Sequence, residues 1–213
     1  MTVVQKYGGS SVADTEKIKR VAMKIKDRTV KGDKVVVVVS AMGKTTDNLI
    51  KLAGEVSSVP DPREMDMLLS TGEQVSISLL AMALHEIKIE AVSFTGSQVK
   101  MITDGAHSNA RIVSVDDKRL RKALEKHSVI VVAGVQGIDA DENITTLGRG
   151  GSDTTAVALA ASLGCNCIIY TDVEGIYPVD PKLYPNAKKI DCIGYKEMIE
   201  MSRLGAGCLL YTS

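Results

Sequence analysis

Tryptophan is absent from the 213-residue chain and phenylalanine occurs once, so the core must be built from aliphatic side chains. Acidic and basic residues number 26 each, and the sequence lacks the clustered basic excess that nucleic-acid binding needs. No basic-then-apolar leader opens the chain, and no apolar run approaches the ~20 residues of a membrane span. From these absences we expect a cytoplasmic protein with no nucleic-acid or membrane partner.

Metal-binding patterns are also missing. The four cysteines contain no Cys-x-x-Cys pair, and Cys165 and Cys167 alternate along an expected strand, so they face opposite ways. We therefore predict reduced thiols and no metal ligands. The three histidines are His85, His107 and His127. They show neither metal spacing nor a paired nucleophile, and we expect them at the surface or as helix caps.

Strand-like and helix-like segments alternate along the chain. Strands are expected over residues 2–6, 35–39, 91–94, 111–115, 129–133 and 167–171. Helices are expected over about 15–30, 46–56, 63–86, 116–127, 156–163 and 195–203, with a hairpin over 134–146 and an irregular segment over 95–109. The β-branched runs 35–39 and 129–133 are typical of strands buried on both faces of a parallel sheet. The alternation predicts an α/β fold, a three-layer αβα sandwich with a mainly parallel central sheet.

The longest expected helix covers residues 63–86. Its apolar spacing predicts a buried stripe at Met65, Leu68, Leu69, Gly72, Ser76, Leu79, Leu80 and Ala83. Glu73 lies beside this stripe, where a carboxylate is costly unless a cation meets it. A substrate ammonium group is one candidate for that cation. The alternatives are a solvated outer face or an internal lysine or arginine partner.

Two glycine-rich turns each follow a strand and open a helix. Residues 147–155 read Leu-Gly-Arg-Gly-Gly-Ser-Asp-Thr-Thr, with Arg149 and Asp153 inside the turn. Such a turn directs backbone N–H groups and a helix dipole at an anion. Lys6-Tyr7-Gly8-Gly9-Ser10-Ser11 ends the first strand, at the sheet edge where ligands collect. Together the two turns predict a phosphate site and favour phosphoryl transfer.

Two further segments carry suitable polar groups. Ser40 and Thr46 follow the second strand and are either ligand-binding hydroxyls or helix caps. The segment after the last strand offers Asp172 for ribose hydroxyls, Tyr177 as a flat contact and Lys182 for phosphate. An ordinary acidic turn is the alternative for this second segment.

Taken together, these segments resemble the aspartate kinases of the amino-acid kinase family. The matching segments are KYGGSSV, VVVVVSAMGKTTDNL, MDMLLSTGEQVS, FTGSQ, TLGRGGSDTTAVALAA and TDVEGIYPVDPKLYPNAKKI. They occur in the family order across residues 1 to about 207, and five or more motifs in order are highly specific. The resemblance implies the amino-acid kinase fold and a catalytic domain over residues 1–207.

The implied reaction converts L-aspartate and ATP, with Mg²⁺, into 4-phospho-L-aspartate and ADP. This is the first step toward lysine, threonine and methionine, and the resemblance implies a homo-oligomer for the full-length enzyme. Another family member, a glutamate or acetylglutamate kinase, is an alternative, although Thr46 and Glu73 in its Ser-Thr-Gly-Glu context favour aspartate. A non-catalytic binding module is the second alternative.

The resemblance also implies roles for individual residues. The catalytic residues would be Lys6, which neutralises the transferring phosphoryl group, and Asp153, which organises that lysine. The ATP contacts would be Lys6, Gly8, Gly9, Ser10, Ser40, Thr171, Asp172, Tyr177 and Lys182. The aspartate contacts would be Thr46, Glu73, Arg149, Gly150, Gly151 and Ser152. Glu73 would take the ammonium group and Arg149 a carboxylate, while the family often has arginine where Lys182 stands.

The chain departs from the family pattern after Gly205-Ala206. Its last six residues, Cys-Leu-Leu-Tyr-Thr-Ser, match the translation of a transposon-end sequencing adapter. We therefore expect residues 208–213 to be a non-native read-through tail on a catalytic domain truncated before its last strands and its ACT regulatory modules. The alternative is a genuine divergent end. An incomplete sheet exposes an edge, which leaves open whether this fragment alone is active.

Overall fold

The computed structural model describes residues 1–148, 150–171, 175–179 and 184–203. The chain divides into two compact units, residues 1–170 and 171–213, and each is described by itself. The first unit contains both sheets and both glycine-rich turns.

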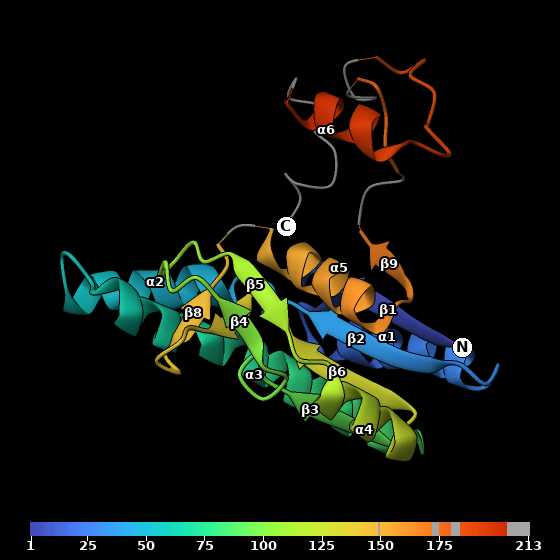
Figure 1. Cartoon of the computed structure of the whole chain (residues 1–213), viewed down its shortest axis with the longest axis horizontal. Coiled ribbons are helices and arrows are strands. Elements are labelled where there is room, and N and C mark those ends of the chain that lie inside the picture. The colour runs from blue at the N-terminus through green and yellow to red at the C-terminus, as the bar shows by residue number, and fades with distance from the viewer. Residues whose placement is uncertain (149, 172–174, 180–183, 204–213) are drawn as a thin grey trace. The chain divides into compact units, whose positions relative to one another are not determined.

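Strands and helices alternate along the first unit, as the sequence predicts (Figure 1). The strands are β1 (Thr2–Tyr7), β2 (Lys34–Val39), β3 (Ala91–Phe94), β4 (Met101–Thr103), β5 (Ile112–Val115), β6 (Val129–Ala133), β7 (Gln136–Ile138), β8 (Ile144–Thr146) and β9 (Asn166–Tyr170). The helices are the short 3-10 turn η1 (Gly9–Val12), α1 (Thr15–Thr29), α2 (Thr45–Val56), α3 (Pro62–Glu86), α4 (Lys118–Lys126) and α5 (Gly151–Leu163). Side-chain caps start two of them, because Asp14 accepts from the Lys17 N–H at 2.8 Å and Asp61 caps α3 just before Pro62.

Five strands form a parallel central sheet in the order β3-β6-β2-β1-β9. β2 and β6 lie side by side within it, and nearly every residue of both strands is buried. β-Branched side chains favour extended backbone, and a strand covered on both faces has no need of alternating polar residues. The parallel sheet predicted from these two runs is therefore confirmed.

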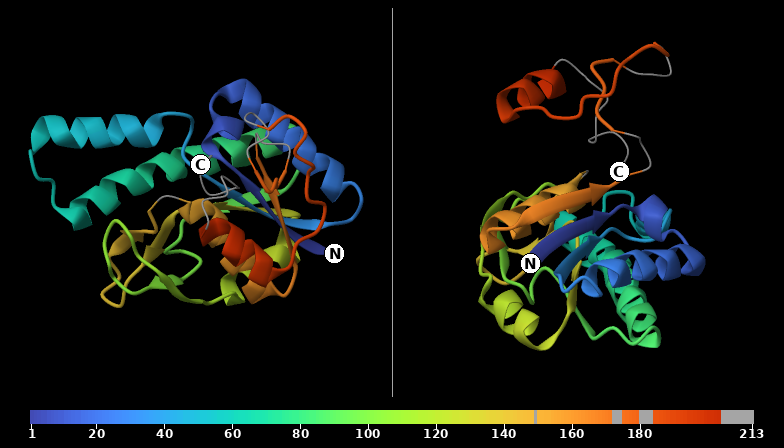
Figure 2. Two further views of the ribbon diagram at one scale, coloured as in Figure 1. Left: turned by 90° about the horizontal axis from the view of Figure 1, so that it is seen from above. Right: turned by 90° about the vertical axis from the view of Figure 1, so that its right-hand side faces the viewer.

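Helices cover both faces of the central sheet (Figure 2). Val35, Val37 and Val39 of β2 pack with apolar residues of α1 and α3. The alternate residues Val36 and Val38 pack with apolar residues of α4 and α5 on the opposite face. The three-layer αβα sandwich is confirmed, and both of its cores are largely aliphatic, as the composition requires.

A second, smaller sheet has the strand order β5-β4-β7-β8. β7 and β8 pair antiparallel and form the hairpin predicted over residues 134–146. The segment expected to be irregular, residues 95–109, contributes β4, which pairs with both β5 and β7. β5 and the β7–β8 hairpin were expected, whereas β4 and the pairing that joins these strands into one sheet were not, because a three-residue strand has too little periodicity for a sequence-based prediction.

Helix α3 buries only part of the expected stripe, at Gly72, Ser76 and Leu80. Met65, Leu68 and Leu69 are only half-buried. The buried residues of α3 are Asp66, Ser70, Gly72, Glu73, Ser76, Ile77, Leu80, Ala81 and Leu84. The expectation was wrong at the start of the helix, where polar groups with buried partners take the place of Met65, Leu68 and Leu69. It was also wrong in the second half, where Ile77, Ala81 and Leu84 are buried and Leu79 and Ala83 are only half-buried.

Among the described residues, α3 is the one helix whose length and composition would allow it to cross a membrane. Its second half packs against β6 and α1 in the core beneath the central sheet. Its first half buries the carboxylates of Asp66 and Glu73. Both observations identify α3 as a core helix of this domain.

The second unit contains helix α6 (Tyr195–Arg203), as predicted, and an isolated antiparallel bridge between Ile176 and Ile190. Residues 204–213 lie outside the described residues, so the predicted domain boundary at 207 and the predicted tail over 208–213 stay predictions.

Candidate active site

Neighbouring strands end together at one edge of the central sheet. β1 and β2 end in register at Tyr7 and Val39, and β6 ends beside β2. The Ser40 N–H donates to the Tyr7 carbonyl at 3.2 Å, and the Gly134 N–H donates to the Val39 carbonyl at 2.9 Å. Ligands of open α/β sheets bind at this carboxyl edge, and the predicted residues that follow β1 and β2 lie here.

The N-terminus of α5 lies against the same edge. The Ser40 hydroxyl donates to the Ser152 Oγ at 2.9 Å. A Cβ on Gly134 would come within 2.8 Å of the Ser152 Cβ, so only glycine allows this approach. The turn before α5 also requires glycine, because Gly148 and Gly150 have φ angles of +73° and +74°. The positive end of the α5 dipole therefore lies where an anion would be stabilised.

Lys6 and Asp153 meet between β1 and α5. The Lys6 Nζ lies 2.8 Å from the Asp153 Oδ1, and the two residues are 4% and 9% exposed. The contact is ionic, since within the described residues the buried Oδ1 has no hydrogen-bond partner of suitable angle. Desolvation offsets much of the attraction in such a pair, so its presence is weak evidence for a role in stability. A buried ammonium group beside a helix N-terminus is well suited to an anionic ligand.

The Gly8-Gly9 segment packs closely against Lys6 and against the loop after β2. A Cβ on Gly8 would lie 3.5 Å from the Lys6 Nζ, and a Cβ on Gly9 would lie 2.8 Å from the Ala41 carbonyl oxygen. Glycine at position 9 is thus required by the close approach of backbone to backbone. Ser10 follows at an exposed position in η1.

Glu73 reaches the loop after β2 from α3. Its Oε1 accepts a hydrogen bond from the Ala41 N–H at 3.1 Å, and the residue is only 5% exposed. Burial raises the pKa of the Glu73 carboxyl from 4.5 to about 7, although backbone hydrogen bonds oppose the shift. Of the lysines, arginines and histidines that the structure describes, none pairs with it. The solvated outer face is therefore wrong, and a ligand cation would relieve the burial of this charge.

Thr46 is the second residue of α2 and is half-buried. The adjacent Thr45 and the Ala41 loop both approach α3 at Gly72, where a Cβ would lie 3.5 Å from the Thr45 Cγ2 and 2.9 Å from the Ala41 Cβ. Thr46 therefore lies in the first turn of a helix that packs near Glu73, but no described hydrogen bond joins the two side chains. Its role stays a prediction.

Five of the predicted residues lie outside the described part of the first unit. Arg149, Asp172 and Lys182 lie outside the described residues. Thr171 and Tyr177 belong to the second unit, which is described by itself. The first unit thus brings Lys6 close to Asp153 and Ser40 close to Ser152, with Glu73 beside the loop that follows β2. The predicted nucleotide contacts after β9 stay predictions.

A buried polar cluster lies at the start of α3 and was missed in the sequence. Asp66 is fully buried and accepts hydrogen bonds from the His107 Nδ1 at 2.8 Å, from the Ser108 N–H at 3.0 Å and from the Thr146 hydroxyl. The expectation of a surface or capping role for His107 is wrong, because its ring bonds to a buried carboxylate. One signal was available, since Asp66 stands seven residues before Glu73 and therefore on the same helix face.

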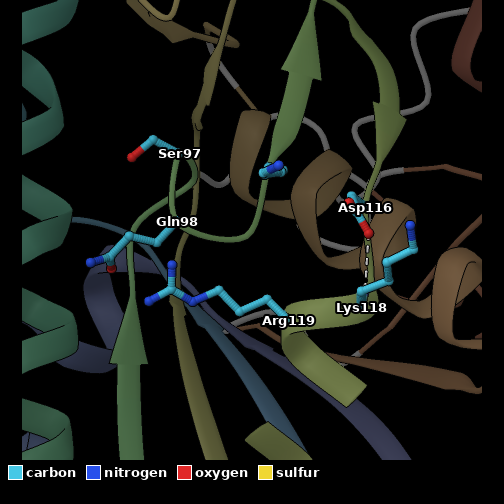
Figure 3. Close-up of a pocket in the computed structure, with 6 residues that line it drawn as sticks. Ser97, Gln98, Asp116, Lys118 and Arg119 are labelled. Carbon is cyan, nitrogen blue, oxygen red and sulfur yellow. Dashed lines mark hydrogen bonds between the residues drawn. The ribbon is translucent and has the colours of Figure 1, made fainter. Parts of the chain in front are cut away.

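A separate hollow of about 270 Å³ lies beside the start of α4 (Figure 3). Its lining residues are Ser97, Gln98, Lys100, Asp116, Lys118 and Arg119. Two of the charged groups have local partners, because Asp116 accepts from the Lys118 N–H at 3.1 Å and the Arg119 guanidinium lies 4.7 Å from the Phe94 ring centroid. None of the predicted site residues lines this hollow.

Comparison with known proteins identifies relatives of the chain. The model of the amino acid kinase family matches residues 1–211. An aspartokinase of Mycolicibacterium smegmatis is 55% identical over 210 residues, which are 98% of this chain and 50% of that protein. The chain thus spans about half the length of the curated relatives it matches.

Solved structures of aspartate kinases are also similar to this chain. The crystal structure of aspartate kinase from Synechocystis matches with a TM-score of 0.84 at 51% identity, over 97% of this chain and 34% of that chain. The structure of E. coli aspartokinase III in complex with aspartate and ADP also matches with a TM-score of 0.84, at 29% identity, over 100% of this chain and 58% of that chain.

Proposed function

Because the chain belongs to the amino acid kinase family, we propose that it is the catalytic portion of an enzyme that transfers the γ-phosphoryl group of ATP to the side-chain carboxylate of L-aspartate. Relatives that share about half its residues are aspartokinases, and one similar structure contains aspartate and ADP. The observation that carries the proposal is the buried contact of Lys6 with Asp153 beside the α5 N-terminus.

The chemistry needs charge stabilisation more than proton transfer. The acceptor carboxylate is ionised at neutral pH, so no general base is required. One of its oxygens forms a bond to the γ-phosphorus while the bond from that phosphorus to the β–γ bridging oxygen breaks and ADP leaves. Two anions must approach each other in this step, and Lys6 and the α5 dipole lie where they would offset the repulsion.

Acceptor binding would use the other charged group of the site. Glu73 is buried without a cation partner among the described residues, and the ammonium group of aspartate would supply that partner. Ser152 would orient the acceptor through its hydroxyl, and Arg149 and Thr46 would complete its contacts, while Ser40 would contact ATP. Binding of a cation would lower the pKa of Glu73 and release its proton.

Mg²⁺ would enter with ATP and neutralise phosphate charge. The described part of the chain holds no group of three His, Cys, Asp or Glu side chains that could bind a metal ion. The residues fit a cation held chiefly by nucleotide phosphates, since Asp153, the carboxylate in the first turn of α5, is already ion-paired through its Oδ1 with the Lys6 ammonium group at 2.8 Å. We further propose a cytoplasmic homo-oligomer for the full-length enzyme, with no nucleic-acid or membrane partner, whose product enters the route to lysine, threonine and methionine.

An acceptor panel tests the proposed reaction. The protein is incubated with ATP, Mg²⁺ and hydroxylamine, which traps an acyl phosphate as a coloured hydroxamate. The kcat/KM for L-aspartate should exceed that for L-glutamate and for N-acetyl-L-glutamate by about a hundredfold. A higher kcat/KM for another acceptor would reassign the substrate within the family. Calorimetric binding of aspartate without ADP formation would instead support a non-catalytic module.

Substitution of Lys6 tests the mechanism. Lys6→Ala should lower turnover by at least about a hundredfold, because it removes charge stabilisation in the transition state. The apparent affinity for ATP should change much less. The matched control is Lys100→Ala, an exposed lysine of the hollow beside α4, which should retain full turnover. Equal losses of turnover and ATP affinity in Lys6→Ala would contradict the assigned role.

A further inference from the structure

Asp66 joins three separate segments at one buried point. The carboxylate belongs to α3, His107 and Ser108 belong to the loop between β4 and β5, and Thr146 ends β8. A carboxylate only accepts hydrogen bonds, so His107 must donate from Nδ1 at 2.8 Å. Moving any of these segments would leave a buried donor or acceptor unsatisfied, which is expensive. The cluster therefore holds the three segments in one arrangement.

The held loop supports the entrance to the glycine turn. The Ala110 N–H donates to the Thr146 carbonyl at 2.9 Å. A Cβ on Gly148 would lie 3.2 Å from both the Ser108 carbonyl oxygen and the Asn109 Oδ1. The turn therefore packs directly on the loop that Asp66 binds. Residues 150–153 follow immediately and open α5.

The same helix carries Glu73 on the same buried face. Seven residues separate it from Asp66, which is two helical turns or about 10 Å along the axis. Between them the Ser70 carbonyl accepts from the Gln136 Nε2 at 3.1 Å, a second tie between α3 and the small sheet. α3 is thus tied to the small sheet and its loop at two points, Asp66 and Ser70, just before it reaches Glu73.

We propose that Asp66 and His107 form a positioning pair that sets the spacing between Glu73 and the N-terminus of α5. In the proposed function, Glu73 takes the acceptor's ammonium group and the α5 N-terminus lies beside the reacting carboxylate. The pair would then determine which acceptor length fits, because aspartate and glutamate differ by one methylene. Neither Asp66 nor His107 has a described contact with Lys6, Asp153 or Glu73, so the effect acts through position alone.

Hydrogen exchange tests the pair without depending on catalysis. Amides of residues 146–153 should exchange about tenfold faster in His107→Ala, because the turn loses its support. His107→Asn should restore slow exchange, since the side-chain amide can donate to Asp66 as Nδ1 does. The control is His85→Ala, which removes a histidine at the other end of α3 whose Nε2 lies 2.8 Å from the Ala91 carbonyl oxygen. Unchanged exchange over 146–153 in His107→Ala, or equal acceleration in His85→Ala, would overturn the proposal.

Steady-state kinetics tests the consequence for the acceptor. The preference for aspartate over glutamate in kcat/KM should fall about tenfold in His107→Ala, within the range that one methylene supports. The loss should arise in the KM for aspartate, with the KM for ATP within about twofold of wild type, and His107→Asn should recover it. An unchanged preference despite faster exchange would overturn the selectivity role. If the full-length enzyme that contains this catalytic portion phosphorylates neither amino acid, the proposed function fails, and the exchange experiment still decides whether the pair positions the turn.

Discussion

Helix α3 buries residues along its whole length, yet its two halves bury opposite chemistry. The first half buries Asp66, Ser70 and Glu73, and the second half buries Ile77, Leu80 and Leu84. The first half lies against the small sheet at β8, and the second half lies against β3 and β6 (Figure 1). Partners far apart in the sequence satisfy the polar half, whereas the apolar half needs only other apolar surface. Burial alone therefore does not distinguish the part of a helix that builds a core from the part that builds a site.

The two buried carboxylates of the polar half differ in the partners that surround them. Asp66 has three hydrogen-bond donors from other segments. Glu73 has a backbone donor from Ala41 and no cation among the described residues. The first is a satisfied structural group, and the second is the group that we propose binds a ligand cation. Substitutions along α3 can therefore separate three roles: the apolar core, the satisfied carboxylate of Asp66 and the proposed ligand-binding carboxylate of Glu73.

The largest effect on stability is expected in the apolar half. Leu80→Ala should reduce the free energy of unfolding by about 2–5 kcal/mol, because Leu80 is fully buried and its truncation leaves a cavity. Aspartate affinity should be unchanged. Urea unfolding measures the loss, and Met82→Ala, at a residue 62% exposed on the same helix, provides the control with little change. A Leu80→Ala protein as stable as Met82→Ala would show that the apolar half is not a core.

Glu73→Gln should remove a pH-dependent loss in the free energy of unfolding that the buried carboxylate causes. The folded pKa of about 7 exceeds the unfolded value of 4.5, so the folded state holds a proton that the unfolded state has released. Wild-type stability should therefore fall, relative to Glu73→Gln, as the pH rises from about 5 to 8, by up to about 3 kcal/mol. Thermal unfolding across this range measures the difference. Parallel stability curves would contradict the burial of an unpaired carboxylate, and an unchanged KM for aspartate would contradict the ammonium contact.

Asp66→Asn should be destabilising where Glu73→Gln is not. The amide offers one acceptor oxygen and turns its NH2 group toward donors, so the free energy of unfolding should fall by about 1–3 kcal/mol. Chemical denaturation measures the loss at pH 7. Glu86→Gln, an exposed position at the end of α3, should stay within about 0.5 kcal/mol of wild type. Equal stability of Asp66→Asn and Glu86→Gln would remove the distinction between the two carboxylates.

Gly72→Ala should give the smallest change and tests the approach of α3 to the Ala41 loop. Alanine favours helix by about 1 kcal/mol, but its Cβ would lie 2.9 Å from the Ala41 Cβ and overpacking costs about 1–3 kcal/mol. We expect a net loss of about 1 kcal/mol in thermal unfolding. Ala41→Gly in the same chain removes the clash, so the double variant should recover the loss. Additive effects of the two changes would show that the contact is not tight.

The regular strands and the extent of α3 were predictable from the sequence, whereas the buried face in the second half of α3 was predicted correctly only at Ser76 and Leu80. The runs at β2 and β6 predict two strands buried on both faces, and both appear side by side in the parallel sheet. The helix over 63–86 is observed over Pro62–Glu86. Long, regular segments repeat one signal many times, so local patterns are sufficient to place them.

The polar half could be predicted only in part. Glu73 was a candidate because a carboxylate beside an apolar stripe needs an explanation, but Asp66 and His107 were not. The Thr146 partner of Asp66 lies 80 residues away, and the short strands β7 and β8 that bring it there have little periodicity. A polar residue next to an apolar stripe is assigned to solvent unless the distant donors that satisfy it are known.

The amino-acid sequence by itself determined which segments become most of the strands and helices, where glycine permits a turn, and that Lys6 and Asp153 lie at the two glycine-rich turns, because these depend on neighbours along the chain. Only the tertiary structure decided which of those groups meet. In the sheet order β3-β6-β2-β1-β9, α5 packs on one face with its N-terminus at the carboxyl edge, and this packing brings Lys6 to Asp153. In the same way, the position of β8 brings Thr146 to Asp66. A buried charge is stable or reactive according to the partners that surround it, and those partners are fixed by packing between segments.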